Sequence, residues 1–138
     1  IDGFCSGFGT GGTITGIGPE LRTVFPKVQI WAAEPEHAAL LSGGAIGTHV
    51  QMGIGDGILP AIMDTALIDE IVVVTDEEAL ECARRLAREE GLFAGISSGT
   101  NVAGALRLAR VLGPGKSVVT QAPDTGERYF STVLFEGE

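Results

Sequence analysis

The chain has 138 residues, of which 44% are hydrophobic, and its 9 basic and 18 acidic side chains give a net charge of −9. The hydrophobic content excludes an intrinsically disordered chain, and the length suffices for one domain with its own core. The acidic balance argues against nucleic-acid binding, because Lys and Arg hold phosphate backbones, and no apolar run approaches the ~20 residues of a membrane-spanning helix.

The first predicted elements are a strand, a helix and a second strand. The apolar segment 1–6 predicts a strand that runs into Gly7, and a helix is expected over residues 12–24. Pro19 lies inside this helix and is expected to kink or restart it, because its ring removes a backbone hydrogen bond. Residues 28–33 predict the second strand.

The middle of the chain is expected to be mostly irregular. Residues 36–67 are rich in glycine and predict loops, with one short helix near 38–41. The continuous apolar run 71–74 then predicts a strand that is covered on both faces.

Two helices and a strand are predicted for the C-terminal part. Thr75 and Glu78 have the spacing of a capping box, which predicts a helix that ends at Gly91. A second amphipathic helix is expected over about 100–112, and the last strand over 117–120. Strands that alternate with helices indicate an α/β fold: one domain, with a mostly parallel sheet that carries helices on both faces as an αβα sandwich.

One of the glycine clusters follows the first predicted strand. Residues 7–13 (GFGTGGT) lead from this strand into the first helix. Free N–H groups and the positive end of the helix dipole make such a loop a site for anions, and Thr10 and Thr13 add hydroxyl donors. We therefore expect phosphate binding here; the alternative is a tight turn without a ligand.

The loop alone leaves the kind of phosphate open. Gly7, Gly9 and Gly12 satisfy the pattern G-x-G-x-x-G. Glu34 follows about 20 residues later at the end of the second strand, where an acidic residue can bind a ribose. Taken alone, this pattern favours NAD, but motifs further along the chain argue for another ligand.

Four motifs occur in order along the chain: 9–16 (GTGGTITG), 53–60 (GIGDGILP), 95–99 (GISSG) and 126–132 (GERYFST). Together they resemble the cysteine synthases (O-acetylserine sulfhydrylases), pyridoxal-phosphate enzymes of the tryptophan-synthase-β-like fold, or fold type II. The resemblance implies that residues 1–138 form the large, C-terminal, cofactor-binding domain of such an enzyme.

The resemblance also implies roles for residues in the first and third motifs. Five residues would bind the cofactor phosphate: Gly9, Thr10, Gly11, Gly12 and Thr13. Ser97 matches the serine that hydrogen-bonds the pyridine nitrogen. A neutral hydroxyl makes the ring a weaker electron sink, which suits replacement at the β-carbon. The alternative for this segment is a helix N-cap, which Ser98 or Thr100 could provide instead.

The second motif resembles the flexible segment that borders the substrate pocket in this family. It places Gly53, Ile54 and Gly55 at the substrate, whereas Asp56 is expected to be merely solvated. Gln51 stands one position away from the family's glutamine and receives no role. Five other residues are expected to pack or to lie in loops, without chemistry: Trp31, His37, His49, Met52 and Met63.

No catalytic residue is expected in this chain. The family's aldimine lysine lies in an N-terminal half that we expect upstream of Ile1, and Lys27 and Lys116 are expected to be surface charges. The resemblance therefore implies a chain that is inactive alone. The complete enzyme would convert O-acetylserine and sulfide to cysteine and acetate, as a homodimer, with serine acetyltransferase as a further partner.

Three alternatives stay open. The chain could belong to a cystathionine β-synthase or threonine dehydratase, it could be a noncatalytic binding fragment, or it could be an NAD-binding Rossmann domain. Cys5 and Cys82 supply neither a disulfide framework nor metal-ligand spacing, so we expect no metal site and a reduced, cytoplasmic setting.

Overall fold

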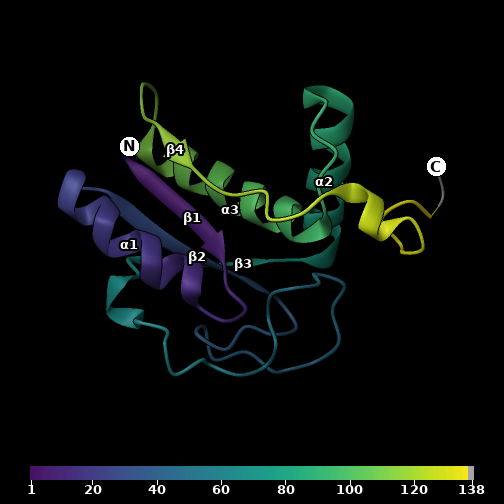
Figure 1. The fold of residues 1–138 in the computed structure, drawn as a ribbon, viewed down its shortest axis with the longest axis horizontal. Coiled ribbons are helices and arrows are strands. Elements are labelled where there is room, and N and C mark those ends of the chain that lie inside the picture. Colours follow the sequence, from purple (N-terminus) through teal and green to yellow (C-terminus); the bar gives the residue numbers. More distant parts are fainter. Residues whose placement is uncertain (137–138) are drawn as a thin grey trace.

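The computed structural model describes residues 1–136, which form one parallel sheet with helices on both faces (Figure 1). Its strands are β1 (Gly3–Gly7), β2 (Gln29–Pro35), β3 (Glu70–Val74) and β4 (Val118–Val119), in the order β3-β2-β1-β4. All the strand pairs are parallel, so the carboxyl ends of the strands meet at one edge of the sheet. The predicted fold class is confirmed.

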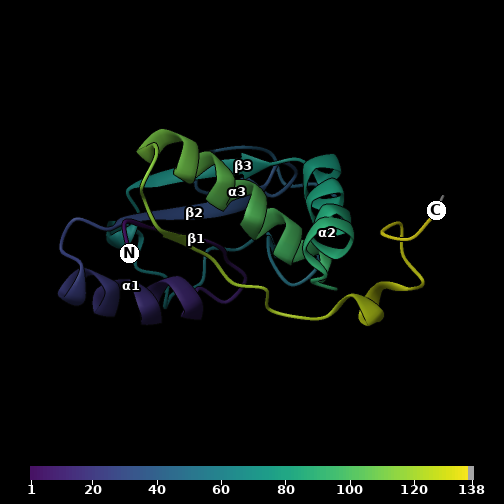
Figure 2. The same cartoon turned by 90° about the horizontal axis from the view of Figure 1, so that it is seen from above.

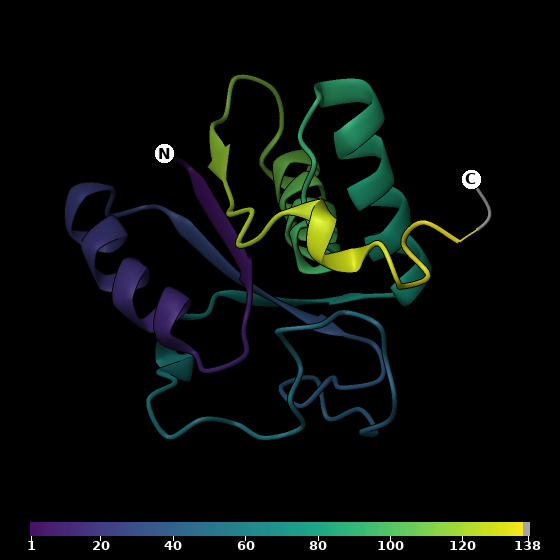
Figure 3. The ribbon, with the colours of Figure 1, turned by 45° about the vertical axis from the view of Figure 1, so that its right-hand side comes forward.

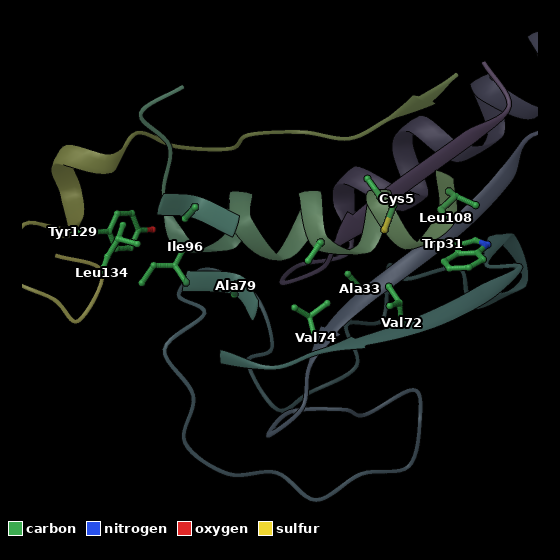
Figure 4. Packing of buried hydrophobic residues seen from close by; sticks show 13 residues of the cluster. Cys5, Trp31, Ala33, Val72, Val74, Ala79, Ile96, Leu108, Tyr129 and Leu134 are labelled. Carbon is green, nitrogen blue, oxygen red and sulfur yellow. The ribbon is translucent and has the colours of Figure 1, made fainter. Parts of the chain in front are cut away.

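Two helical layers enclose the sheet. Helix α1 (Gly12–Val24) covers one face, and α2 (Asp76–Glu90) and α3 (Ile96–Leu112) cover the other (Figure 2). Side chains alternate along β1, so that Phe4 packs in the core beneath α1 and Cys5 in the core beneath α3. Figure 4 shows the second of these cores, which extends from Leu108 to Tyr129 and Leu134. Within the described residues, no helix is both long and apolar enough to cross a membrane.

Helix α1 continues through Pro19, so the expected restart of this helix is wrong. The ring removes only one helical hydrogen bond, and packing holds the turns on either side of it. Gly18 lies against Leu67 and Ile30, where an added Cβ would stand 3.3 Å and 3.4 Å from their Cδ1 atoms.

The predicted helix at 38–41 is also wrong, because turns occupy this segment. Glu34, buried at the end of β2, dictates the local structure. Its Oε2 accepts the N–H of Leu41 at 2.9 Å, and its Oε1 accepts the N–H and the hydroxyl of Ser42 at 2.9 and 2.5 Å. A short 3₁₀ turn over Thr65–Leu67 (η1) then leads to β3.

Helix α3 begins at Ile96, four residues earlier than expected, and it is buried along most of its first three turns rather than amphipathic. Tertiary contact explains both differences. Gly99 packs so tightly on the carbonyl of Ala79 in α2 that an added Cβ would collide with it. The C-terminal segment, which includes a 3₁₀ turn over Gly126–Tyr129 (η2), then passes α3 toward α2 (Figure 3), where Arg84 donates to the carbonyl of Leu134 at 2.9 Å.

Candidate functional site

A cavity of about 310 Å³ lies where β1 ends, at the carboxyl edge of the sheet. Segments 7–13 and 52–54 line it, together with Ser97 and Asn101 of α3 and four residues between positions 121 and 129. Ligands of open α/β sheets bind at this edge, so the cavity is the candidate site.

The glycine loop 9–13 presents an open helix N-terminus to this cavity. Helix α1 starts at Gly12, and its N-cap, Gly11, has a left-handed φ of 82° and no capping side chain. Within residues 1–136, the N–H groups of Gly9, Thr10 and Gly11 donate to no protein acceptor. No acidic residue lies in the first turn to offset the helix dipole. A loop of free amides followed by a helix was expected and is present, but the helix begins at Gly12, inside the range 9–13 that was expected to precede it.

The loop at 53–55 packs against the glycine loop. A Cβ on Gly9 would stand 2.6 Å from the backbone oxygen of Gly53 and 3.4 Å from Oδ2 of Asp56, so only glycine fits there. Gly53 and Ile54 line the cavity, as expected, but Gly55 does not. Its N–H instead donates to the carbonyl of Phe8 at 3.1 Å, which ties the two loops together.

Ser97 lies on the same cavity as the glycine loop, which confirms the expectation that the fold brings them together. Ser97 is 3% exposed, and within the described chain its hydroxyl has no protein partner. The N-cap of α3 is Gly95, so neither Ser98 nor Thr100 has the capping role considered for it. The hydroxyl of Ser98 is buried without a partner, and that of Thr100 donates to Gln51.

Asn101, which is 1% exposed, also lines the cavity, although it was not identified from the sequence. Its Oδ1 accepts the N–H of Gly7 at 2.6 Å, and its Nδ2 donates to the carbonyl of Gln121 at 3.0 Å. The available signal in the sequence was a polar residue directly before the apolar run 102–106.

Asp124 and Tyr129, which were not identified from the sequence, line the same cavity as the glycine loop. The hydroxyl of Tyr129 donates to Oδ2 of Asp124 at 2.5 Å. Burial, together with this hydrogen bond, raises the pKa of Tyr129 to about 12, so its hydroxyl stays protonated at neutral pH. Oδ1 of Asp124 is buried without a partner.

Gln51, given no role from the sequence, is fully buried and fastens the loop that follows it. Its Nε2 donates to the carbonyl of Val74 at 3.0 Å and to Asp76 at 2.9 Å, and its Oε1 accepts the hydroxyl of Thr100 at 2.8 Å. A saturated buried amide of this kind holds its segment in one arrangement.

His49 and Met52 differ from the sequence expectations in detail. Nδ1 of His49 accepts the N–H of Gln51 at 3.2 Å, and its Nε2 lies 3.0 Å from the carbonyl of Gly55, so this loop histidine has a supporting role. Met52 was expected to pack, but it is 53% exposed on the cavity. Met63 and Trp31 are buried, as expected.

The remaining candidates do not contribute to the cavity. Both carboxylate oxygens of Glu34 are engaged by the 41–42 turn, which removes the ribose-binding acid that an NAD site requires. Lys116 pairs with Asp2 at 2.9 Å on the exposed side of the chain. Cys5 and Cys82 are both free, and among residues 1–136 no group of three or more metal-ligating side chains occurs.

The chain is similar to known proteins in both sequence and structure. The family model described as "Pyridoxal-phosphate dependent enzyme" matches residues 1–124. A cysteine synthase of Staphylococcus aureus (strain Mu50) is 47% identical over 135 residues, which are 98% of this chain and 44% of the relative. An O-ureido-L-serine synthase of Streptomyces lavendulae is 44% identical over 137 residues, which are 99% of this chain and 42% of the relative.

A solved structure agrees with the sequence relationship. The crystal structure of O-acetyl serine sulfhydrylase isoform 3 from Entamoeba histolytica superposes with a TM-score of 0.95 at 36% identity. The match covers 100% of this chain and 42% of that chain. The chain thus spans less than half the length of the relatives that it matches.

Proposed function

The chain belongs to the family of pyridoxal-phosphate dependent enzymes, and from this premise we propose that it provides the phosphate and ring-nitrogen sites of a cysteine synthase. The reaction is β-replacement, in which O-acetylserine and sulfide give cysteine and acetate. The observation that carries the proposal is the single cavity on which an uncapped glycine loop and the unpartnered hydroxyl of Ser97 meet.

The residues of the cavity fit the cofactor. Free N–H groups at Gly9, Thr10 and Gly11 are the donor set that a phosphate monoester requires, and the glycine backbone leaves room for close approach. A cavity of about 310 Å³ has space for a phosphorylated pyridine ring. Pyridoxal phosphate, when bound, supplies an electron sink that stabilises negative charge on the substrate carbon.

In this proposal each wall of the cavity has one task. The free amides of the glycine loop, with the hydroxyls of Thr10 and Thr13, bind the phosphate, and the α1 dipole favours its negative charge. The hydroxyl of Ser97 hydrogen-bonds the ring nitrogen and, being neutral, leaves it unprotonated. The loop of Gly53 and Ile54 borders the amino-acid substrate and excludes water on that side.

We further propose that the lysine that bonds the cofactor lies outside this chain. Lys27 is exposed beside Pro26, and Lys116 is paired with Asp2, so neither reaches the cavity. The complete enzyme would contain a separate N-terminal half, consistent with the 44% coverage of the Staphylococcus aureus relative.

The proposal includes assembly and location. Aliphatic side chains on the 57–62 loop are unusually exposed, with Ile58 at 69% and Ile62 at 61%, which supports burial in a homodimer or against the N-terminal half. Serine acetyltransferase, the enzyme class that makes O-acetylserine, is the proposed protein partner. The free thiols of Cys5 and Cys82 support a reduced, cytoplasmic setting.

Ligand titration tests the proposal. We expect the chain to bind pyridoxal phosphate weakly and NAD not at all, and to form no cysteine by itself. Adding the N-terminal half of a cysteine synthase should restore both tight cofactor binding and turnover. Cysteine formation by the chain alone would make Lys27 or Lys116 catalytic and would contradict the proposal.

A pair of hydroxyl deletions tests the ring-nitrogen site. Ser97→Ala should weaken binding of pyridoxal phosphate and leave binding of inorganic phosphate unchanged. Thr125→Val is the matched control, because Thr125 carries an exposed hydroxyl on the segment beside the cavity. If Thr125→Val selectively weakened binding of pyridoxal phosphate and Ser97→Ala did not, the hydroxyl of Thr125 rather than that of Ser97 would bond the ring nitrogen.

A further inference from the structure

We propose that Asn101 is a positioning residue that sets the distance between the phosphate site and the ring-nitrogen site. The inference rests on the proposed function, since it concerns how this chain holds both ends of one ligand. Asn101 lies one helical turn after Ser97 on α3, so the two side chains share a face of the helix. It is also the α3 residue that accepts the N–H of Gly7, two residues before the glycine loop 9–13.

The sheet leaves a gap at this point, and Asn101 fills it. β4 pairs with β1 only at Gly3 and Phe4, so the end of β1 lacks a neighbouring strand on that side. Asn101 accepts from the N–H of Gly7 and donates to the carbonyl of Gln121. A carboxamide has the donor and the acceptor of a peptide group, so it replaces a missing link between the two backbones.

Two other side chains span the same gap, at the β1 residues just before Gly7. The hydroxyl of Thr120 donates to the carbonyl of Cys5 at 2.6 Å, and Nε2 of Gln121 donates to the hydroxyl of Ser6 at 2.9 Å. Neither bond involves α3, so Asn101 is the one of these bridging residues that ties β1 to the helix that carries Ser97. The tie is made at Gly7, the last residue of β1, which only Phe8 separates from the loop.

The glycine loop has anchors that do not depend on Asn101. Gly11 packs on Met63, where an added Cβ would stand 3.1 Å from its sulfur. The hydroxyl of Thr15 accepts the N–H of Asp64 at 3.1 Å, and the carbonyl of Phe8 accepts the N–H of Gly55. Loss of Asn101 should therefore let the loop shift relative to α3 while its own shape persists.

Because the loop keeps its own shape without Asn101, two ligands can distinguish a shift of the loop from a loss of the loop. Inorganic phosphate touches only the glycine loop, whereas pyridoxal phosphate also reaches Ser97. In Asn101→Ala we expect the affinity for pyridoxal phosphate to fall on the order of tenfold, and that for inorganic phosphate by less than about threefold. Both are measured by calorimetric titration of the 138-residue chain, with thermal unfolding to verify that the variant is folded.

Two variants serve as controls. Thr120→Val removes a bond of the same length to β1, yet Thr120 does not line the cavity, so it should lower stability and leave the ratio of the two affinities unchanged. Asn101→Asp keeps the acceptor for Gly7, which is the bond between α3 and β1, but it loses the donor to Gln121 and places a negative charge at the cavity. It should weaken both ligands alike and again preserve the ratio.

The outcomes separate this inference from the proposed function. An unchanged ratio in Asn101→Ala, or an equal change of ratio in Thr120→Val, would overturn the positioning role alone. If Asn101→Ala fails to fold, an altered ratio in Asn101→Asp would overturn it. A wild-type chain that binds neither phosphate nor pyridoxal phosphate would overturn the proposed function, and this inference with it.

Discussion

Helices α1 and α2 begin in opposite ways, although both follow a strand of the same parallel sheet. At α2, the hydroxyl of Thr75 accepts the N–H of Glu78 at 3.1 Å, and the carboxylate of Glu78 accepts the N–H of Thr75 at 3.0 Å. Three acidic residues occupy its first turn. The start of α1 has neither a capping side chain nor an acid. The helix dipole is common to both, so local side chains decide whether it stabilises the fold or stays available to a ligand.

Giving α1 the chemistry of α2 should have the largest effect. Thr13→Glu places a carboxylate in the first turn of α1, where it should stabilise the helix and repel phosphate. We expect binding of pyridoxal phosphate to weaken about 100-fold, from a repulsion of about 2.7 kcal/mol at short range. Fluorescence titration measures the affinity. Thr23→Glu, at the other end of α1, is the control, and equal affinities in the two variants would contradict the comparison.

Removing the cap of α2 should affect stability alone. Thr75→Ala leaves the N–H of Glu78 without its side-chain acceptor and should lower the free energy of unfolding by about 1 kcal/mol. Urea denaturation measures this loss. Affinity for pyridoxal phosphate should match that of the wild type, because this helix end does not line the cavity; a parallel loss of affinity would speak against separate roles for the two helix ends.

The charge of Glu78 gives α2 a pH dependence that α1 lacks in its first turn. Burial alone would raise the pKa of Glu78, but the bond from the Thr75 N–H and the ion pair with Arg107 lower it below its ordinary value of 4.5. The ionised form therefore stabilises the fold above that value, and the stabilisation is lost as the pH falls through the lowered pKa.

Glu78→Gln tests this pH dependence. The variant keeps a side-chain acceptor for the cap, so at pH 7 it should cost less than about 1 kcal/mol, given the partial exposure of the ion pair. Thermal unfolding between neutral and acid pH should show a smaller loss of stability in Glu78→Gln than in the wild type. Glu81→Gln, an exposed acid of the same helix without a bond to Thr75, is the control; identical curves for all three proteins would rule out the assigned role.

The smallest effect is expected at the start of α3, which has no side-chain cap. The hydroxyl of Ser98 is buried without a partner, so Ser98→Ala should leave the free energy of unfolding unchanged or raise it by up to about 0.5 kcal/mol. Chemical denaturation measures the free energy of unfolding of the variant and of the wild type. A loss of about 1 kcal/mol would instead mean that Ser98 caps the helix in solution.

Local signals explain which parts of the fold could be predicted from the sequence. The glycine loop and the box of Thr75 and Glu78 are set by neighbours within a few residues, and both form as expected. The start of α3 depends on contact between Gly99 and α2, and the 38–41 turns depend on the buried carboxylate of Glu34. Neither partner is adjacent in sequence, so propensity alone placed both elements wrongly.

The candidate site divides in the same way. Ser97 and the glycine loop lie in motifs and were found, whereas Asn101 acts through a bond to a residue 94 positions away. Its side chain is recognisable only once β1, α3 and the segment after β4 are placed together. Asp124 and Tyr129 were missed for a related reason, because the segment that carries them forms a wall only after it crosses α3.

The pairing of β1 with β4 has a consequence for synthesis. Gly3 and Phe4 pair with Val118 and Val119, so the first strand finds its second neighbour only after most of the chain has been made (Figure 1). Contacts of such sequence separation form slowly, because a long loop must close before they contribute. The β1, α1 and β2 unit can assemble early on the ribosome, but the cavity is completed only when the last strand arrives. The cavity residues between positions 121 and 129 follow β4, so they take their places only after this pairing has formed.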